Sequence, residues 1–375
     1  MKRRILFLVN HEVVIYNFRL ELVVRLLKDG YQVLISSPYG ERIKELEELG
    51  CISIHTTMDR HGVSILRDMK LLMHYRKILK QYSPSVVLTY TIKPNIYGGV
   101  ACRMQKIPYI ANITGLGTAV ENAGFLQSFT SFLYKHALRN AQKVFFQNKE
   151  NQAFFEKKRI ALGKYGLLTG SGVNLEKYSF VKYPNEDGTV RLVFIGRIMT
   201  DKGIKELLEA VNQVHAKHPF FTCDIVGFFE GNTHKTAVES FCSLGAGKYL
   251  GVSDEVHEMM SNYHAVVLPS YHEGMSNILL EAAATGRPVL ASNIPGCRET
   301  FDEGFSGFGF EPRSVHSLVE AIERFIVLSH EKKAAMGLAG RKKMEQEFDR
   351  QIVVDAYMRE IEYKLEVNEK KDKKK

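Results

Sequence analysis

The feature that most constrains this chain is an alternation between short apolar runs and longer segments with helical periodicity. Short runs rich in Val, Ile and Leu are typical of strands buried in a parallel sheet, and apolar residues spaced three and four apart indicate helices that cover the sheet. The alternation predicts βαβ units with right-handed crossovers. The expected strands are residues 4–9, 31–36, 51–55, 85–89, 109–113, 143–147, 190–195, 222–226, 249–250, 265–268 and 289–291.

The pattern stops once and then restarts. The interruption contains the turn-forming sequence Pro184-Asn-Glu-Asp-Gly188, which is typical of a connector. The sequence therefore predicts an α/β protein with two Rossmann-like domains facing across a cleft. The expected parts are a first domain (1–175), a linker (176–188), a second domain with terminal helices (189–367) and a charged tail (368–375) expected to be disordered. The clearest expected helices are 18–28, 42–49, 205–215, 315–328, 332–348 and 351–364.

Composition narrows the class of protein. The chain has 375 residues, a length that favours two domains. Its five cysteines are scattered without a Cys-x-x-Cys pair, which favours a reducing cytoplasm and argues against structural zinc. No apolar run reaches the roughly 18 residues of a membrane-spanning helix. The apolar run that follows the basic N-terminus is too short for a signal peptide and is expected to be the first strand.

Charge is distributed unevenly. Residues 1–170 contain 25 Lys and Arg against 12 Asp and Glu, a formal charge of +13, whereas residues 171–375 carry −4. A basic half fits an ordinary solvated surface, and it also fits a surface that meets an anionic membrane, a phosphorylated ligand or nucleic acid. Because no nucleic-acid-binding motif accompanies the charge, nucleic acid is not an expected partner.

The stretch from Ser270 to Glu281, Ser-Tyr-His-Glu-Gly-Met-Ser-Asn-Ile-Leu-Leu-Glu, is the first candidate site. It follows the expected strand 265–268 and becomes helical near Ser276. Glu273 therefore lies at the carboxyl end of a strand and just before a helix, where open α/β sheets bind ligands and where helix ends favour anions. Glu281 lies just over one turn into that helix, so the carboxylates of Glu273 and Glu281 can face one ligand.

A second candidate stretch opens the second domain. It reads Phe194-Ile-Gly-Arg-Ile-Met-Thr-Asp-Lys-Gly203 and leaves the end of the expected strand 190–195. Gly196 allows the backbone to approach a ligand, and Arg197 and Lys202 supply two cations suited to a diphosphate.

These motifs resemble those of the nucleotide-sugar-dependent, retaining glycosyltransferases of the GT-B fold, family 4. The resemblance rests on Gly196-Arg-x4-Lys-Gly203, on Glu273-Gly-x-Ser-Asn-x3-Glu-Ala282 and on Gly286-x-Pro-Val289, which occur in the family's order. It covers nearly the whole chain. The nearest branch extends lipid-linked glycans or capsular polysaccharides and includes N-acetylgalactosaminyltransferases; Phe18-Arg19 and Gly115-Leu-Gly117 carry that closer likeness.

The resemblance implies roles for the donor-side residues. Arg197 and Lys202 would bind the donor diphosphate, Glu273 would contact the transferred sugar, and Glu281 would hold the ribose hydroxyls. The amides around the helix start would face phosphate. The implied donor-binding residues are Gly196, Gly274, Met275, Ser276, Asn277 and Glu281, and the implied catalytic residues are Glu273, Arg197 and Lys202.

The first domain departs from the family's common pattern. Its loop after the first strand, Asn10-His-Glu-Val-Val-Ile-Tyr-Asn17, has no glycine. Where many relatives have a histidine before a glycine, this chain has Thr114 before Gly115, so the departing phosphate is a candidate base. The expected acceptor-side residues are His11, Lys93, Thr114 and Gly115, with a solvated lysine the alternative for Lys93.

No cofactor or metal ion is expected, because no Asp-x-Asp motif follows a strand and His215 and His218 fit a solvated helix end. The aromatic segment 125–139 is either a core helix or an interfacial helix that lies among lipid headgroups. The expected location is the inner face of the cell membrane, with peripheral attachment.

The function that unites these observations is transfer of a hexose or N-acetylhexosamine from a UDP-sugar to a polyprenyl-diphosphate-linked saccharide, with retention of configuration. Two alternatives stay open at this point. One is an enzyme like UDP-N-acetylglucosamine 2-epimerase, and the other is a basic membrane- or nucleic-acid-binding protein without activity.

Overall fold

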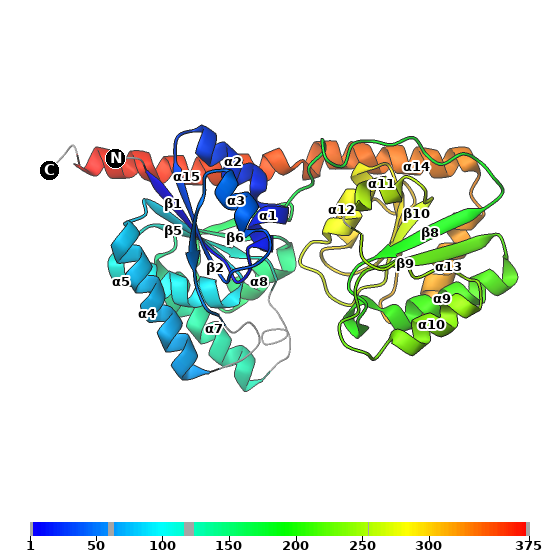
Figure 1. The fold of residues 1–375 in the computed structure, drawn as a ribbon, viewed down its shortest axis with the longest axis horizontal. Helices are drawn as coiled ribbons and strands as arrows, with labels where there is room; N and C mark the ends of the chain where they lie inside the picture. Colours follow the sequence, from blue (N-terminus) through cyan, green and yellow to red (C-terminus); the bar gives the residue numbers. More distant parts are fainter. Residues whose placement is uncertain (1–2, 59–63, 116–123, 254, 373–375) are drawn as a thin grey trace. The chain divides into compact units, whose positions relative to one another are not determined.

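The chain forms two compact units in a computed structural model that describes residues 3–58, 64–115, 124–253 and 255–372 (Figure 1). The first unit combines Met1–Ser171 with Gln351–Lys375, and the second comprises Gly172–Arg350. Each unit contains one parallel sheet with its own core, as the alternation of the sequence predicts.

The first unit is built on a seven-stranded sheet with the order β3-β2-β1-β4-β5-β6-β7, in which every neighbouring pair is parallel. The order reverses beside β1, because the chain first moves outward to β2 and β3 and then returns to β4 on the other side. The strands are β1 (Arg4–Leu8), β2 (Gln32–Ser37), β3 (Ile52–His55), β4 (Val86–Tyr90), β5 (Tyr109–Ile113), β6 (Lys143–Phe146) and β7 (Tyr165–Leu167).

Helices cover both faces of this sheet, and alternate residues of each strand enter different cores. In β1, Leu6 and Leu8 face one core while Ile5 and Phe7 face the other, which is the two-residue period of a strand. The helices are α1 (Val13–Phe18), α2 (Leu20–Lys28), α3 (Ile43–Glu48), α4 (Ile65–Tyr82), α5 (Gly99–Gln105), α7 (Phe125–Ala137), α8 (Lys149–Lys157) and α15 (Arg350–Asp372), with a π-helix at Pro94–Gly98 and a 3₁₀ turn at Leu138–Asn140.

The second unit has a five-stranded parallel sheet with the order β12-β11-β10-β8-β9, which reverses beside β8. Its strands are β8 (Val190–Ile195), β9 (Phe221–Val226), β10 (Ala265–Leu268), β11 (Val289–Ser292) and β12 (Gly307–Phe310). Its helices are α9 (Ile204–Lys217), α10 (Lys235–Ser243), α11 (Val256–Met260), α12 (Asn277–Ala284), α13 (Val315–Ile326) and α14 (His330–Lys343), with short turns at Thr200–Lys202 and Arg298–Thr300 and a π-helix at Met344–Phe348.

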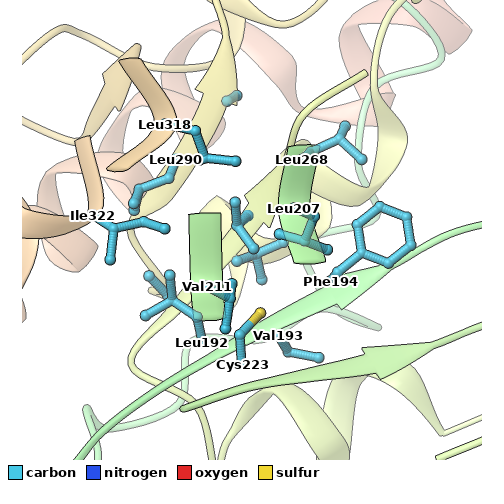
Figure 2. Packing of buried hydrophobic residues seen from close by; sticks show 14 of the residues in the cluster. Leu192, Val193, Phe194, Leu207, Val211, Cys223, Leu268, Leu290, Leu318 and Ile322 are labelled. Atoms are coloured by element: carbon cyan, nitrogen blue, oxygen red, sulfur yellow. The ribbon is translucent and has the colours of Figure 1, made fainter. Parts of the chain in front are cut away.

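The core of the second unit holds the ends of β8 and β10 in place. Figure 2 shows Leu192 and Phe194 of β8 packed with Leu207 and Val211 of α9 and with Leu268 of β10. All five side chains are at most 1% exposed. Burying a side chain of this size stabilises the fold by about 1.5–3 kcal/mol, so the loops that leave these strands start from fixed points.

The sequence predicted most elements and missed those with weak local signals. The strands 109–113, 190–195 and 265–268 have the expected bounds. Strands β7 and β12 were not expected, because β7 is only three residues long and β12 reads Gly-Phe-Gly-Phe without a β-branched residue. The expected strand at 249–250 is reduced to a single bridge between Ile225 and Tyr249. The expected helix 18–28 begins two residues later, as α2 at Leu20, and a separate short helix, α1, occupies part of the loop expected before it.

The last helix belongs to the first unit, which corrects its expected place in the second domain. Five residues of α15 that are at most 3% exposed pack into the core that contains Ile5 and Phe7; they are Val353, Val354, Tyr357, Met358 and Ile361. The helix also runs to Asp372, so residues 368–372 are helical rather than disordered. Residues 373–375 of the expected tail lie outside the described residues.

The expected linker is anchored to the second unit by Arg287. This side chain has no exposed surface, and its guanidinium donates hydrogen bonds to the carbonyls of Val181 and Lys182 as well as to those of Met260, Ser261 and Gly286. Burial lowers the pKa of Arg287 to about 10. A buried cation is tolerated when its donors are satisfied, and here five carbonyl oxygens satisfy them.

Within residues 3–58, 64–115, 124–253 and 255–372, no helix is both long enough and apolar enough to cross a bilayer.

The position of α15 generates a first prediction. Replacing Tyr357 by Ala removes a fully buried ring and should destabilise the first unit by about 3–5 kcal/mol. Hydrogen exchange should speed up in β4 and β5 and stay unchanged in β8 and β9. The matched control is Tyr363→Ala on the same helix, because Tyr363 is 64% exposed. Faster exchange in β8 and β9 alone would contradict the assignment.

Candidate active site

Two loops flank the point where the strand order of the second sheet reverses. One follows β8 and contains residues 196–203, and the other follows β10 and contains residues 269–276. In open α/β sheets, ligands bind in the crevice at this position because the loops diverge there. The two sequence motifs, separated by about 70 residues in the chain, are therefore brought to one edge of the sheet.

Backbone contacts hold the two loops together. The amide of Tyr271 donates a hydrogen bond to the carbonyl of Asp201 at 2.8 Å. Gly203 has φ +66°, and a Cβ atom there would lie 2.1 Å from the carbonyl oxygen of Pro269. A side chain is excluded both by the left-handed backbone and by this contact. The glycine of the motif is thus required by the packing of one loop on the other.

Lys202 and Glu273 form an ion pair across the two loops. The Lys202 Nζ contacts Glu273 Oε1, and the Ser270 hydroxyl donates a hydrogen bond to the same oxygen at 2.8 Å. The two side chains are only 18% and 14% exposed. Because solvent screens such a pair weakly, the contact fixes the orientation of the carboxylate at the edge of the crevice.

Arg197 has a different partner from the one its motif suggests. Its guanidinium forms an ion pair with Glu230 at 2.6 Å, and both side chains are about half exposed. An exposed ion pair contributes little to stability, typically 0–1 kcal/mol. Arg197 can therefore leave Glu230 for an anionic ligand at little cost, whereas Lys202 is already fixed.

Gly196 is less crowded than the motif suggests. Among the described residues, a Cβ atom at Gly196 would meet only the ring of Phe194, at 3.4 Å. The tight position is Gly227, the residue after β9, where a Cβ atom would lie 1.8 Å from the carbonyl oxygen of Gly196. The loop after β9 therefore closes on the Gly196 backbone, and no feature of the sequence analysis had indicated this role for Gly227.

Helix α12 begins directly after Glu273 and Gly274. Within the described residues, the N-cap Ser276 makes no side-chain capping bond, although its own amide donates to the carbonyl of Gly296 at 2.8 Å. The Oδ1 atom of Asn277 is buried and accepts no hydrogen bond from any described group. Uncapped amides at a helix start carry partial positive charge and suit a phosphate.

Met275 and Gly296 hold in place the turn that leads into α12. The Met275 side chain is 8% exposed and packs with Tyr178 and Met344 in a small core, so of this residue only the backbone is available to a ligand. Gly296 has φ +81°, and a Cβ atom there would lie 2.7 Å from the carbonyl of Gly274. The loop 293–297 therefore fixes the path of the chain through Glu273 and Gly274.

Glu281 lies one turn into α12 in a setting that favours its neutral form. Burial raises the pKa of its carboxyl from 4.5 to about 7, against the opposing effects of a hydrogen bond with Tyr178 and of the positive charges of Arg350 and Lys177. A carboxyl that titrates near neutral pH can accept hydrogen bonds from hydroxyl groups once it is ionised. The position of Glu281 was expected from the sequence, but Tyr178 was not expected as its partner.

The expected acceptor-side residues follow three adjacent strands of the first sheet. His11 follows β1, Lys93 follows β4, and Thr114 and Gly115 follow β5. A Cβ atom at Gly115 would meet no atom of the described residues within 4 Å. Gly117, the other glycine of this motif, lies outside the described residues.

The sequence left open that Lys93 is an ordinary solvated lysine, and the structure shows that it is not. Its Nζ atom pairs with Asp68 Oδ1 at 2.7 Å, and the two side chains are 15% and 9% exposed. The Tyr97 hydroxyl donates to the other oxygen of Asp68 at 3.0 Å. Lys93 thus belongs to a largely buried polar group beside β4.

Comparisons with known proteins agree with this geometry. Residues 177–343 match the family described as glycosyl transferases group 1, and residues 4–148 match the family described as glycosyl transferase 4-like. The chain is a glycosyltransferase of the GT-B fold, family 4. The motifs that led to this expectation all lie within the two matched segments, and the epimerase and non-enzymatic alternatives are set aside.

Individual relatives match most or nearly all of the glycosyltransferase. The N,N'-diacetylbacillosaminyl-diphospho-undecaprenol alpha-1,3-N-acetylgalactosaminyltransferase of Campylobacter jejuni is 27% identical over 95% of this chain and 97% of that protein. The UDP-Gal:alpha-D-GlcNAc-diphosphoundecaprenol alpha-1,3-galactosyltransferase of Escherichia coli is 26% identical over 70% of this chain and 72% of that protein. A glycosyltransferase structure from Rickettsia africae shares the fold, with a TM-score of 0.81 at 19% identity, covering 97% and 99% of the two chains.

The raised pKa of Glu281 generates a prediction on stability. Because the folded-state pKa lies above the usual value of 4.5, the contribution of this carboxyl to stability is fully present below pH 4.5 and is lost as the pH rises through about 7. Glu281→Gln keeps a neutral side chain at every pH. Relative to the wild type, its free energy of unfolding should rise between pH 4.5 and 8, by up to about 3 kcal/mol. Urea unfolding at each pH measures this difference, and a difference that is constant with pH would contradict it.

Proposed function

We propose that this glycosyltransferase moves a hexose or N-acetylhexosamine from a UDP-sugar to a polyprenyl-diphosphate-linked saccharide, with retention of configuration and without a metal ion or cofactor. The observation that carries the donor half is the Lys202–Glu273 pair at the switch point of the second sheet, beside the uncapped start of α12. The names of the relatives from C. jejuni and E. coli support the acceptor class, and the second name supports UDP as the nucleotide.

The arrangement suits the loss of a diphosphate. Arg197, Lys202 and the amides of α12 supply positive charge where negative charge develops on the leaving group, and stabilising such charge is usually the largest single catalytic effect. Glu273, held by Lys202 and Ser270, places negative charge beside the sugar carbon that becomes positive. Ionised Glu281 accepts hydrogen bonds from the ribose hydroxyls.

The bond changes balance without a further group. The acceptor oxygen forms a bond to the anomeric carbon, and the bond from that carbon to the phosphate oxygen breaks with its electron pair leaving on UDP. The acceptor proton passes to the departing phosphate. Attack on the face that the diphosphate leaves preserves the configuration.

The first functional prediction separates the roles of Lys202 and Glu273. Lys202→Ala should weaken UDP binding by about tenfold or more, because a hydrogen bond to a charged group is worth roughly 1.5–3 kcal/mol. Glu273→Gln should lower kcat by more than about tenfold while UDP binding persists, because it acts on charge that appears only in the transition state. Calorimetry with UDP and turnover of UDP-sugars measure the two effects.

The matched control is Lys217→Ala on α9. Lys217 is 61% exposed and paired with Glu323, so this variant removes one lysine from the second unit away from the two loops. Undiminished UDP affinity in Lys202→Ala, or undiminished turnover in Glu273→Gln, would refute the corresponding role.

A lipid-linked acceptor requires the protein to work at a membrane, and we propose that α4 and α7 of the first unit meet it on the inner face of the cell membrane. On α4, Ile65, Leu66, Met69 and Met73 are 57–76% exposed at helical spacing. On α7, Leu126, Phe129 and Phe132 are 41–55% exposed at a spacing of three. Both helices pack against the π-helix Pro94–Gly98 and against α5 (Figure 1).

Charge indicates which surface these helices fit. Arg67 and Lys70 lie between the exposed apolar residues of α4, and Lys135 lies near the end of α7. Residues 1–170 as a whole carry a formal charge of +13. Each basic residue near an anionic lipid surface contributes about 1 kcal/mol, and exposed apolar side chains flanked by cations are typical of interfacial helices.

The second functional prediction concerns this surface. Binding to vesicles that contain anionic lipid should fall as salt rises, since screening shortens the range of the attraction. Leu66→Ser combined with Phe132→Ser should weaken binding by about tenfold, because two apolar side chains no longer leave water. Co-sedimentation with anionic and neutral vesicles measures both effects.

Two controls make the test decisive. Phe305→Ser changes a residue of the second unit that is 76% exposed and should leave vesicle binding unaltered. A chain that ends at Asn368 removes the lysine-rich sequence 370–375, which could bind lipid unaided. If that shortened protein ignores anionic vesicles at low salt, the first unit does not provide the membrane surface.

A further inference from the structure

The first sheet has its own switch point, between β1 and β4. The loop that follows β1 carries His11 and Glu12, and the residue that follows β4 is Thr91. Ligands of open parallel sheets bind at such reversals. His11, Glu12 and Thr91 lie on the two segments that border the reversal between β1 and β4.

Glu12 is a buried carboxylate that lacks the usual partners. Its side chain is 1% exposed, and neither oxygen accepts a hydrogen bond from the residues that the structure describes. Burying a carboxylate without donors is costly, so such a group needs a charge partner. The partner that the structure supplies is the ring of His11, whose Nδ1 atom lies 2.7 Å from Glu12 Oε2.

The loop after β2 leaves room for the carboxylate in this position. A Cβ atom at Gly40 would lie 1.9 Å from Glu12 Oε1, so a side chain at position 40 would displace the carboxylate from its place. Glycine at position 40 therefore makes space for Glu12 on one side, and His11 meets the carboxylate on the other.

His11 itself is accessible. Its side chain is 32% exposed, in contrast to the enclosed Glu12. A carboxylate beside Nδ1 favours the tautomer with the proton on that atom, which leaves Nε2 as a hydrogen-bond acceptor. The Val13 amide donates a hydrogen bond to the same Nδ1 atom at 3.4 Å, a longer contact that is given up when Nδ1 carries the proton.

Thr91 is a second, independent observation at the same reversal. It has φ +69°, a left-handed conformation that is an outlier for a β-branched residue. Its buried hydroxyl has no hydrogen-bond partner among the described groups. Backbone strain of this kind concentrates at ligand-binding sites, where the surrounding structure maintains it.

From these contacts we infer that His11, oriented by Glu12, binds a hydroxyl group of the acceptor saccharide at the switch point of the first sheet. This inference rests on the proposed function, since it names the residues that recognise the acceptor. Glu12 is a positioning residue in this arrangement, and His11 is the residue that touches the sugar.

The charges favour a hydroxyl over a phosphate as the ligand. Glu12 and His11 together carry no net positive charge, so the pair does not attract a diphosphate. The neighbouring cations have partners of their own: Lys93 pairs with Asp68, Arg42 lies over the ring of Tyr16, and Arg19 lies over the rings of Tyr90 and Tyr357. A neutral sugar hydroxyl is the group that fits an oriented imidazole.

The first test examines the pair itself, by nitrogen NMR of the histidine rings in the full-length protein. Glu12→Gln should reduce the share of His11 rings that carry their proton on Nδ1, because the amide no longer demands a donor. The matched control is Glu320→Gln, which changes the exposed His316–Glu320 pair, 84% and 58% exposed, and should leave the His11 signals alone. An unchanged His11 tautomer in Glu12→Gln would overturn the inference.

The second test measures transfer to a short-chain polyprenyl-diphosphate N-acetylhexosamine. Glu12→Gln and His11→Ala should each raise the acceptor KM about tenfold, the loss expected for one hydrogen bond, and should change the acceptor KM more than the KM of the UDP-sugar. The double variant should be no worse than either single one, because the two residues act as a unit. Additive losses would mean that Glu12 has only a structural role and would overturn the inference.

The two tests keep this inference separate from the proposed function. If the wild type transfers sugar to no polyprenyl-diphosphate saccharide, the proposed acceptor is wrong, and the ring spectra still decide whether Glu12 orients His11. If transfer occurs and Glu12→Gln changes neither the spectra nor the acceptor KM, the inference fails alone. Thermal unfolding of each variant, with His11→Asn as a milder substitute, identifies any loss of folding.

Discussion

The reversal of strand order beside the first strand of each sheet is the constraint on which the rest of this glycosyltransferase depends. Parallel strands all end at the same edge, so their connecting loops compete for space there, and only at the reversal do neighbouring loops run in opposite directions. In the second sheet this opening lies between β8 and β10, and in the first between β1 and β4. The residues with unusual chemistry are found beside these two openings.

Exposure determines what each charged group can do. The Lys202–Glu273 pair and the Lys93–Asp68 pair are at most 18% exposed and serve as fixed points. Arg197 and Glu230 are about half exposed, so their pair can be exchanged for a ligand at little cost. Glu281 represents a third case, since burial raises its pKa to about 7 and makes its charge sensitive to ordinary changes of pH.

Glycines shape the donor-side loops through backbone contacts rather than through flexibility. Gly203 touches the carbonyl of Pro269, Gly227 that of Gly196, and Gly296 that of Gly274, and all three have positive φ. Each contact draws two loops closer than any side chain would permit. These glycine contacts hold together the loops that carry Lys202 and Glu273, and this brings the two side chains into contact.

The sequence by itself determined the fold class, the two-unit plan and the family, because strand and helix periodicity and the turn residues of the motifs are local properties. It placed β8 and β10 correctly and located Lys202, Glu273 and Glu281 on the loops and helix where they are found. Only the tertiary structure decided which distant groups meet: α15 with the first sheet, Arg197 with Glu230, Tyr178 with Glu281, and Gly40 with Glu12. The sequence of an amphipathic helix shows that one face is apolar, but it does not show which surface covers that face. In the same way, the sequence shows that a side chain is a carboxylate, but it does not show how deeply the carboxylate is buried, and burial sets its pKa.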